Sequence, residues 1–128
     1  MKKWQCSVCG YIYDESISFT GDGGFGMAGM EFTTAVQNKL PITVIVFNDG
    51  KLKNIKKEQT AYGYPEYRVS FPNPGFADMA TSAGGLGIRV SKAENLDSTI
   101  RKVLDSSLPS LVEILVDSNR VIQAVQRG

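Results

Sequence analysis

Two glycine-containing turns, each directly after a short apolar run, lie within residues 17–50, which read ISFTGDGGFGMAGMEFTTAVQNKLPITVIVFNDG. The run Ile17–Thr20 is expected to form a short buried strand, and the β-branched run Ile42–Phe47 a second one. Between them, Met27–Lys39 carries apolar residues at helical spacing. The order strand, turn, helix, strand is typical of a parallel sheet with crossover helices. This stretch therefore predicts an α/β fold.

The rest of the chain continues the same alternation of strands and helices. Lys51–Asn73 has no clean period and is expected as a long connection with room for one short helix; connections of this length are often functional. Five further elements are expected: helices at Phe76–Ala83, Ala93–Leu104 and Ser118–Arg127, and strands at Leu86–Val90 and Leu111–Val116. Together these elements predict a three-layer, Rossmann-like parallel sheet.

The composition is that of a single globular domain. Of the 128 residues, 42% are hydrophobic and 21% charged, which is enough apolar material for one core. Fourteen lysines and arginines nearly balance thirteen acidic residues, so no nucleic-acid partner is expected. The longest apolar run, Leu40–Phe47, is far shorter than the roughly 20 residues of a membrane helix. The first residues lack the apolar core of a signal peptide, so we expect a cytoplasmic protein without a membrane partner.

Histidine is absent from the chain. Histidine is the commonest general base and is required by Ser-His and Cys-His nucleophile arrangements. Any chemistry must therefore use carboxylates, thiolates or a cofactor.

The glycine-rich turn Gly21–Gly26 formally matches the G-x-G-x-x-G pattern of dinucleotide sites. Asp22, however, lies where a pyrophosphate would approach, and its carboxylate would repel the phosphates unless a divalent cation lay between them. Because adjacent parallel strands bring their carboxyl ends together, Asp22 is expected to face Asn48 and Asp49. Such hard oxygen ligands suit magnesium, and a helix beginning near Met27 would direct its dipole at the phosphates. The sequence thus predicts a magnesium diphosphate site.

The segment from Ile17 to about Asn119 resembles the C-terminal, diphosphate-binding domain of thiamine-diphosphate enzymes, of the pyruvate oxidase and acetolactate synthase type. The resemblance lies in Gly21-Asp22-Gly23, which is followed by Leu40-Pro41 and then by Asn48-Asp49. It implies thiamine diphosphate and magnesium as cofactors. The metal ligands that it implies are the side chains of Asp22 and Asp49 and the backbone carbonyl of Lys51. The cofactor-binding residues that it implies are Gly21, Asp22, Gly23, Gly24, Asn48, Asp49 and Lys51.

Members of this family also have a pyrimidine-binding domain, whose glutamate activates the cofactor, and a further strand and helix ahead of the Gly-Asp-Gly strand. Neither is recognisable in these 128 residues, so we expect a truncated domain that binds the cofactor without turnover of its own. The alternative is a subunit of a split oxidoreductase that acts on pyruvate or another 2-oxo acid together with a pyrimidine-domain subunit. The missing strand would leave an apolar edge, which favours a homo-oligomer.

Residues 1–16 are expected to form a separate unit ahead of the domain at 17–128. Met1–Glu15 is similar to the N-terminal metal knuckle of rubredoxins, with Lys3–Gln5 and Tyr11–Tyr13 expected as the strands of a hairpin. The rubredoxin-like residues are followed directly by those that resemble the diphosphate-binding domain, and no residues of linker composition lie between them. Such a junction is expected in a chimera or a gene fragment.

The knuckle carries the two cysteines of the chain, Cys6 and Cys9. Two thiolates cannot complete a tetrahedral iron or zinc site, so a metal would require a second copy of the chain, as in an electron-transfer dimer. Alternatively, the cysteines are free thiols or a labile disulfide, and the hairpin only takes the place of the missing strand.

Overall fold

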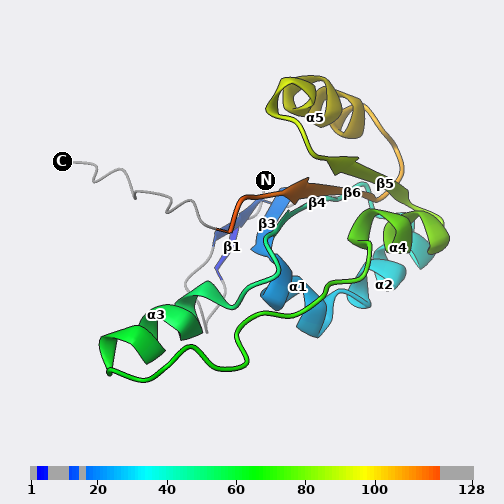
Figure 1. The fold of residues 1–128 in the computed structure, drawn as a ribbon. Coiled ribbons are helices and arrows are strands. Elements are labelled where there is room, and N and C mark those ends of the chain that lie inside the picture. Colours follow the sequence, from blue (N-terminus) through cyan, green and yellow to red (C-terminus); the bar gives the residue numbers. More distant parts are fainter. Residues whose placement is uncertain (1–2, 6–11, 15–16, 119–128) are drawn as a thin grey trace.

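The computed structural model describes residues 3–5, 12–14 and 17–118 (Figure 1). Within them, six strands form one sheet in the order β1-β2-β3-β4-β6-β5. The strands are β1 (Lys3–Gln5), β2 (Ile12–Asp14), β3 (Ile17–Gly21), β4 (Thr43–Asn48), β5 (Leu86–Val90) and β6 (Ser110–Leu115).

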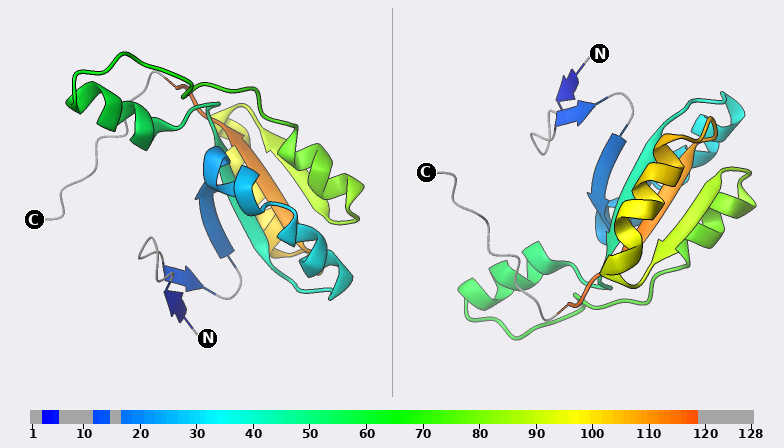
Figure 2. Two further views of the ribbon diagram at one scale, coloured as in Figure 1. Left: turned by 90° about the horizontal axis from the view of Figure 1, so that it is seen from below. Right: turned by 90° about the horizontal axis from the view of Figure 1, so that it is seen from above.

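The helices lie on both faces of this sheet, in three layers (Figure 2). Helices α1, α2 and α4 cover one face, and α5 covers the other, whereas α3 lies beyond the end of the sheet. The helices are α1 (Asp22–Ala28), α2 (Glu31–Gln37), α3 (Lys53–Ala61), α4 (Phe76–Ser82), the 3₁₀ helix η1 (Ala93–Asn95) and α5 (Leu96–Leu104). None of the helices in the described part of the chain is long and apolar enough to cross a membrane.

The four strands β3, β4, β6 and β5 are parallel, which confirms the predicted α/β fold. In β4, Thr43 pairs with Ile17 of β3 on one side and with Ser110 of β6 on the other. Because β4 and β6 have neighbours on both edges and helices on both faces, their sequences are almost continuously apolar, as buried parallel strands are. The predicted strand boundaries agree with the observed ones to within one residue.

Each face of the sheet has its own hydrophobic core. On the α1, α2 and α4 face, the core consists of Phe25, Phe32, Val46, Phe76, Ala80 and Leu111. On the α5 face, it consists of Ile45, Val90, Val103 and Val112. Neighbouring residues of one strand point to opposite faces, so Ile45 and Val46 of β4 enter different cores. The even-numbered residues of β4, including Asn48, therefore face α1 and α4.

The predicted glycine-rich turn is wrong in its local structure, because residues 22–28 form helix α1. Phe25 is buried and packs edge-on against Phe76 of α4, with 5.2 Å between the ring centroids. This tertiary contact stabilises a helix that its three glycines disfavour. The predicted helix Met27–Lys39 is accordingly two helices, α1 and α2, which are separated at Gly29 and Met30.

The N-terminal hairpin lies beyond β3 in the sheet. Strands β1 and β2 pair antiparallel, and β2 meets β3 through the pair Asp14 and Ile17. This is the position that the sequence left for a missing strand. The cysteines Cys6 and Cys9, and the helix predicted at Ser118–Arg127 from residue 119 onwards, lie outside the described residues.

Candidate cofactor site

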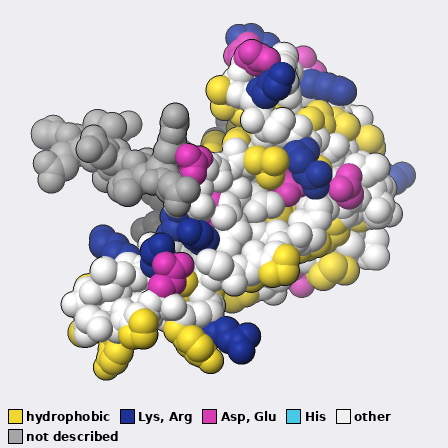
Figure 3. Space-filling view, in the orientation of Figure 1, with side chains coloured by type: hydrophobic (Ala, Val, Ile, Leu, Met, Phe, Trp, Pro, Cys, Tyr) yellow, Lys and Arg dark blue, Asp and Glu magenta, His cyan; other side chains and the backbone are white. Residues whose placement is uncertain are grey.

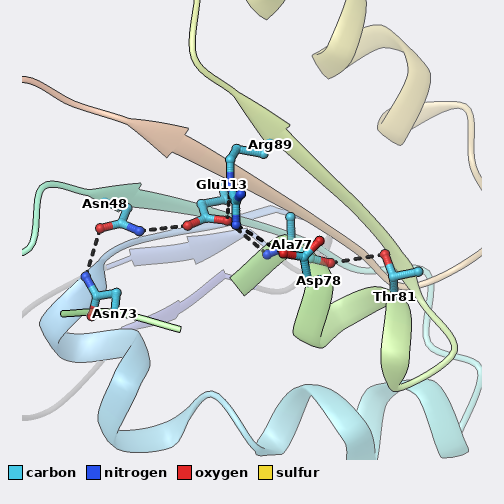
Figure 4. A network of polar contacts seen from close by, with 7 residues as sticks. All are labelled: Asn48, Asn73, Ala77, Asp78, Thr81, Arg89 and Glu113. Atoms are coloured by element: carbon cyan, nitrogen blue, oxygen red, sulfur yellow. Dashed lines mark hydrogen bonds and ion pairs between the residues drawn. The ribbon is translucent and has the colours of Figure 1, made fainter. Parts of the chain in front are cut away.

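The predicted site residues gather at the carboxyl ends of β3 and β4. Asp22 follows β3 directly and opens α1, and Asn48 is the last residue of β4. Asn73 belongs to the long connection between α3 and α4 and lies against Asn48 in Figure 4. The carboxyl ends of parallel strands are where ligands bind in open α/β sheets.

Asp22 is the centre of the site. Its side chain is buried, with an exposed fraction of 3%. One carboxylate oxygen, Oδ1, accepts a hydrogen bond from the Gly23 amide at 2.8 Å. The other, Oδ2, accepts hydrogen bonds from the backbone amides of Gly50 at 2.6 Å and Asp49 at 3.2 Å. Asp22 therefore holds the turn after β4 against the start of α1.

Gly50 gives this turn its shape. Its φ of +67° lies in the left-handed region, which residues with a side chain adopt only at a cost. Its carbonyl accepts a hydrogen bond from the Phe71 amide at 3.0 Å, which ties the turn to the segment that leads to Asn73. The Asn-Asp-Gly sequence predicted the turn, whereas the contact with Phe71 has no local signal.

The side chain of Asn73 contacts both of the oxygen atoms that could bind a cation at this site. Its Nδ2 donates to Asp22 Oδ2 at 2.6 Å and to Asn48 Oδ1 at 2.8 Å. One nitrogen thus approaches a carboxylate oxygen and an amide oxygen at once. A small cation between the same two oxygens would meet the hard oxygen donors that magnesium prefers. The donor set therefore fits the predicted metal.

Asp49 differs from its expected orientation. The carboxylates of Asp22 and Asp49 were expected to face one another, but Asp49 Oδ2 forms an ion pair with Lys53 Nζ at 2.6 Å. Its Oδ1 accepts a hydrogen bond from the Lys51 amide at 3.0 Å. The cause is α3, which begins at Lys53 and brings a cation to the residue four positions earlier. Asp22 and Asp49 are joined through the Asp49 amide instead.

The glycines of the motif leave different amounts of room. A Cβ atom at Gly23 would lie 2.6 Å from Leu52 Cδ2, and one at Gly24 would lie 3.1 Å from Thr20 Oγ1. A Cβ at Gly21 would meet nothing within 4 Å. The backbone at Gly23 is therefore closely covered by Leu52, while the space beside Gly21 is open.

Glu113 is a functional candidate that the sequence analysis did not single out. It is the charged residue in the apolar strand β6, and its exposed fraction is 1%. Its Oε1 accepts a hydrogen bond from Asn48 Nδ2 at 2.7 Å. Its Oε2 accepts from the Ala77 amide at 3.1 Å and from Arg89 Nε at 3.0 Å. A charge within an otherwise buried strand was the available signal (Figure 4).

These contacts keep Glu113 ionised. Burial by itself would raise the pKa of the carboxyl, but the hydrogen bonds from Ala77, Asn48 and Arg89 and the charge of Arg89 together lower it below its usual 4.5. The pKa of Arg89 is raised, mainly by its hydrogen bond to Glu113. Arg89 in turn forms an ion pair with the exposed Asp78 at 3.3 Å.

The lowered pKa predicts acid sensitivity through Glu113. A carboxyl whose pKa is lowered in the folded state stabilises the fold at any pH above its unfolded-state pKa of 4.5. This contribution is lost as the pH falls through the folded-state pKa. We expect Glu113→Gln to reduce the free energy of unfolding by about 2 kcal/mol at pH 7 and by progressively less below about pH 4.5. Urea unfolding of both proteins from pH 7 to pH 3 measures this difference. A difference that stays constant over this range would contradict the prediction.

A buried carboxylate and an amide oxygen lie together where β3 passes into α1 and where β4 ends in the Asn-Asp-Gly turn, and the carboxyl ends of parallel strands are where α/β domains bind ligands. The chain belongs to the family described as thiamine pyrophosphate enzyme, C-terminal TPP binding domain, whose model matches residues 10–114. Thiamine diphosphate is the cofactor that this family implies.

Curated relatives agree with this assignment. The chain is 38% identical over 102 residues to YdaP of Bacillus subtilis, which is named as a thiamine pyrophosphate-containing protein; the match covers 80% of the chain and 18% of the relative. It is 32% identical over 104 residues to the acetolactate synthase of Bacillus subtilis, with 81% of the chain and 18% of the relative covered. The chain thus spans about a fifth of the length of these relatives.

A solved structure supports the fold. The thiamine diphosphate-dependent 4-hydroxybenzoylformate decarboxylase of Rhodococcus jostii RHA1 superposes with a TM-score of 0.75 at 24% sequence identity. The match covers 79% of this chain and 19% of the decarboxylase. The fold of this chain therefore matches that of about a fifth of the decarboxylase.

Several predictions about the N-terminal residues stay predictions. The rubredoxin likeness, the chimeric junction and the division at residue 17 depend on a segment that is described only in part. In the described segments, no group of three or more acidic, cysteine or histidine side chains is placed to hold a metal ion. The predicted iron or zinc site at Cys6 and Cys9 lies outside them.

Proposed function

We propose that this domain binds Mg²⁺ and, through it, the diphosphate of thiamine diphosphate. The observation that carries the proposal is the pair of oxygens, Asp22 Oδ2 and Asn48 Oδ1, that one nitrogen of Asn73 contacts at 2.6 and 2.8 Å. When bound, thiamine diphosphate supplies a nucleophilic carbon that adds to carbonyl groups. The role of this chain is to hold the diphosphate end.

Asp22 is the ligand that the contacts support most directly. Its carboxylate is buried, and hard anionic oxygens are the protein ligands that Mg²⁺ prefers. For the second side-chain ligand, the contacts favour Asn48 over the predicted Asp49, because the Asp49 carboxylate is engaged with Lys53. Lys51 remains the proposed source of the backbone carbonyl, and Gly23 and Gly24 of the diphosphate contacts.

We also propose how the domain would take part in a reaction. The chain spans about a fifth of its relatives, so the carboxylate that activates the cofactor would come from a pyrimidine-binding domain outside these residues. We propose that the domain has no turnover alone and acts with such a domain on pyruvate or another 2-oxo acid, as in pyruvate oxidase or acetolactate synthase.

An exposed pair of aromatic side chains on the sheet supports the proposal that another protein chain or domain binds there. Phe19 of β3 and Phe47 of β4 stack at 6.5 Å between centroids, and their exposed fractions are 44% and 41%. Figure 3 shows that hydrophobic side chains and charged side chains of both signs lie next to one another on one face of the molecule. Association through a second copy of the chain, or through the pyrimidine-binding domain, would bury apolar surface of this kind.

Calorimetric titration with thiamine diphosphate, with and without Mg²⁺, tests the proposed function. We expect saturable binding that requires the metal. Binding of equal affinity in the presence of a chelator would contradict a metal-mediated diphosphate site, and no heat at millimolar cofactor would contradict cofactor binding by the domain itself. Metal analysis and the visible absorption spectrum of the same preparation test the predicted iron or zinc at Cys6 and Cys9.

Asn73→Ala is expected to change stability and metal affinity in opposite directions. Without the amide, Asp22 and Asn48 lose a shared donor, which should lower the free energy of unfolding by about 1–2 kcal/mol. The same loss removes the side-chain donor that contacts both oxygens, although Asp22 Oδ2 keeps its hydrogen bonds from the Gly50 and Asp49 amides, so the dissociation constant for Mg²⁺ should decrease. Thermal unfolding and titration with MgCl₂ measure the two effects. Weaker metal binding by the variant would show that Asn73 supports the metal rather than competing with it.

A further inference from the structure

The Asp49 carboxylate lies in a nearly covered position and has a lysine as its counter-ion. The exposed fraction of its side chain is 10%, whereas that of the Lys53 side chain is 39%. Lys53 is the first residue of α3, and its Nζ lies 2.6 Å from Asp49 Oδ2. A covered carboxylate without a compensating charge would destabilise the fold, so Asp49 needs a cation beside it. Without a bound metal, the Lys53 ammonium is that cation.

The backbone of Asp49 lies directly beside Asp22, the proposed metal ligand. The Asp49 amide donates a hydrogen bond to Asp22 Oδ2 at 3.2 Å, and the Gly50 amide donates to the same oxygen at 2.6 Å. The Asp49 carboxylate is held by two different groups, because Oδ1 accepts from the Lys51 amide at 3.0 Å and Oδ2 pairs with Lys53. The contact of Oδ1 is local and is compatible with a cation on Oδ2. The ammonium therefore occupies the oxygen that a metal ion beside Asp22 could use.

We propose that Lys53 competes with Mg²⁺ for the Asp49 carboxylate and so limits the affinity of the site for the metal. The inference rests on the proposed function, because it takes the metal to bind at Asp22. The ligand set that the family resemblance implies, Asp22, Asp49 and the Lys51 carbonyl, is completed only when Mg²⁺ displaces the ammonium from Asp49. An ammonium and a divalent cation on one carboxylate oxygen would repel each other, because they would be in close contact. The metal therefore gains from Asp49 only what exceeds the loss of the ion pair.

Lys53→Met tests the competition directly. Methionine keeps an unbranched side chain at the start of α3 but removes the ammonium. In calorimetric titration with MgCl₂ alone, we expect Mg²⁺ to bind about three- to fivefold more tightly, which corresponds to the strength of an ion pair that is partly open to solvent. The unfolding temperature should decrease slightly, because the Asp49 carboxylate loses its counter-ion. A purely structural role of Lys53 would instead lower stability and metal affinity together.

Two single variants serve as matched controls. Lys53→Arg keeps the positive charge at the same position, so the Mg²⁺ affinity should stay within about twofold of that of the original protein. Lys57→Met removes an exposed lysine one turn further along α3, where salt screens the charge, so the affinity should again change by less than about twofold. An equal gain in Lys53→Met and Lys57→Met would attribute the effect to the general charge of α3 and overturn the inference.

The double variant K53M/D49N identifies the carboxylate for which the two cations compete. Without the Asp49 carboxylate, Lys53→Met should no longer tighten Mg²⁺ binding, because the shared anion is gone. A gain of the same size in the D49N background would overturn the role of Asp49. An original protein that binds Mg²⁺, with unchanged or weaker affinity in K53M, would overturn the inference alone. An original protein that binds no Mg²⁺ would overturn the proposed function as well, so the two failures are distinguishable.

The original protein provides a second readout that does not depend on the folding of any variant. During titration with MgCl₂, the side-chain NMR signals of Lys53 should shift as the site saturates, because the ammonium leaves Asp49. Those of Lys57 should stay in place. Lys53 signals that do not move at saturation would mean that the metal ion and the ion pair coexist, which would overturn the competition.

Discussion

Asp22→Asn is expected to weaken Mg²⁺-dependent binding of thiamine diphosphate by at least about 100-fold. The substitution keeps the size of the side chain but removes the anionic charge, which is the main attraction for a hard divalent cation at this buried position. It also sets a side-chain NH₂ group against the backbone amides of Gly23 or Gly50, which now donate to the carboxylate. Calorimetry with and without Mg²⁺ measures the loss, and thermal unfolding shows how much of it is due to stability.

Asp49→Asn is the matched control, because it makes the same chemical change directly after β4, the strand next to β3. The Asp49 carboxylate faces Lys53 and the Lys51 amide, so we expect Mg²⁺-dependent binding to change by less than about fivefold. If Asp49 is a metal ligand, as the family resemblance implies, both substitutions should weaken binding to a similar extent. Full affinity in the Asp22 variant would refute the proposed site altogether.

The strands could be predicted because their signal is local. A β-branched apolar run predicted β4, and β5 follows Gly84 and Gly85, which lie in the turn after the preceding helix. Helix α1 could not be predicted in the same way, because Gly23, Gly24 and Gly26 have low helix propensity. Its stability comes from the contact between Phe25 and Phe76, which are far apart in the sequence.

The same distinction between local and long-range signals applies to the residues of the site. Asp22 and Asn48 could be predicted because each follows a recognisable strand, and parallel strands bring such positions together. Asn73 and Glu113 could not, because their partners in the site lie 51 and 65 residues away. The orientation of Asp49 depends on where α3 begins, and the unclear periodicity of the long connection did not define that residue.

The largest expected effect on stability is that of Gly87→Ala. Gly87 is in β5, and a Cβ atom at this position would overlap the backbone carbonyl oxygen of Ala77 in α4. A backbone atom cannot rotate away as a side chain can, so α4 would have to move off the sheet. Such a shift would also separate the Ala77 amide from Glu113. We expect the free energy of unfolding to fall by about 3 kcal/mol or more, measured by urea unfolding.

Gly26→Ala provides the opposite case within the same fold. A Cβ atom at Gly26 would meet nothing within 4 Å, and the residue lies inside α1. Alanine has a higher helix propensity than glycine, so this variant should be more stable by about 0.5–1 kcal/mol. If Gly87→Ala were as stable as Gly26→Ala, α4 would not be packed closely on β5. Glu113 would then lack the fixed backbone donor that directs its other oxygen toward Asn48.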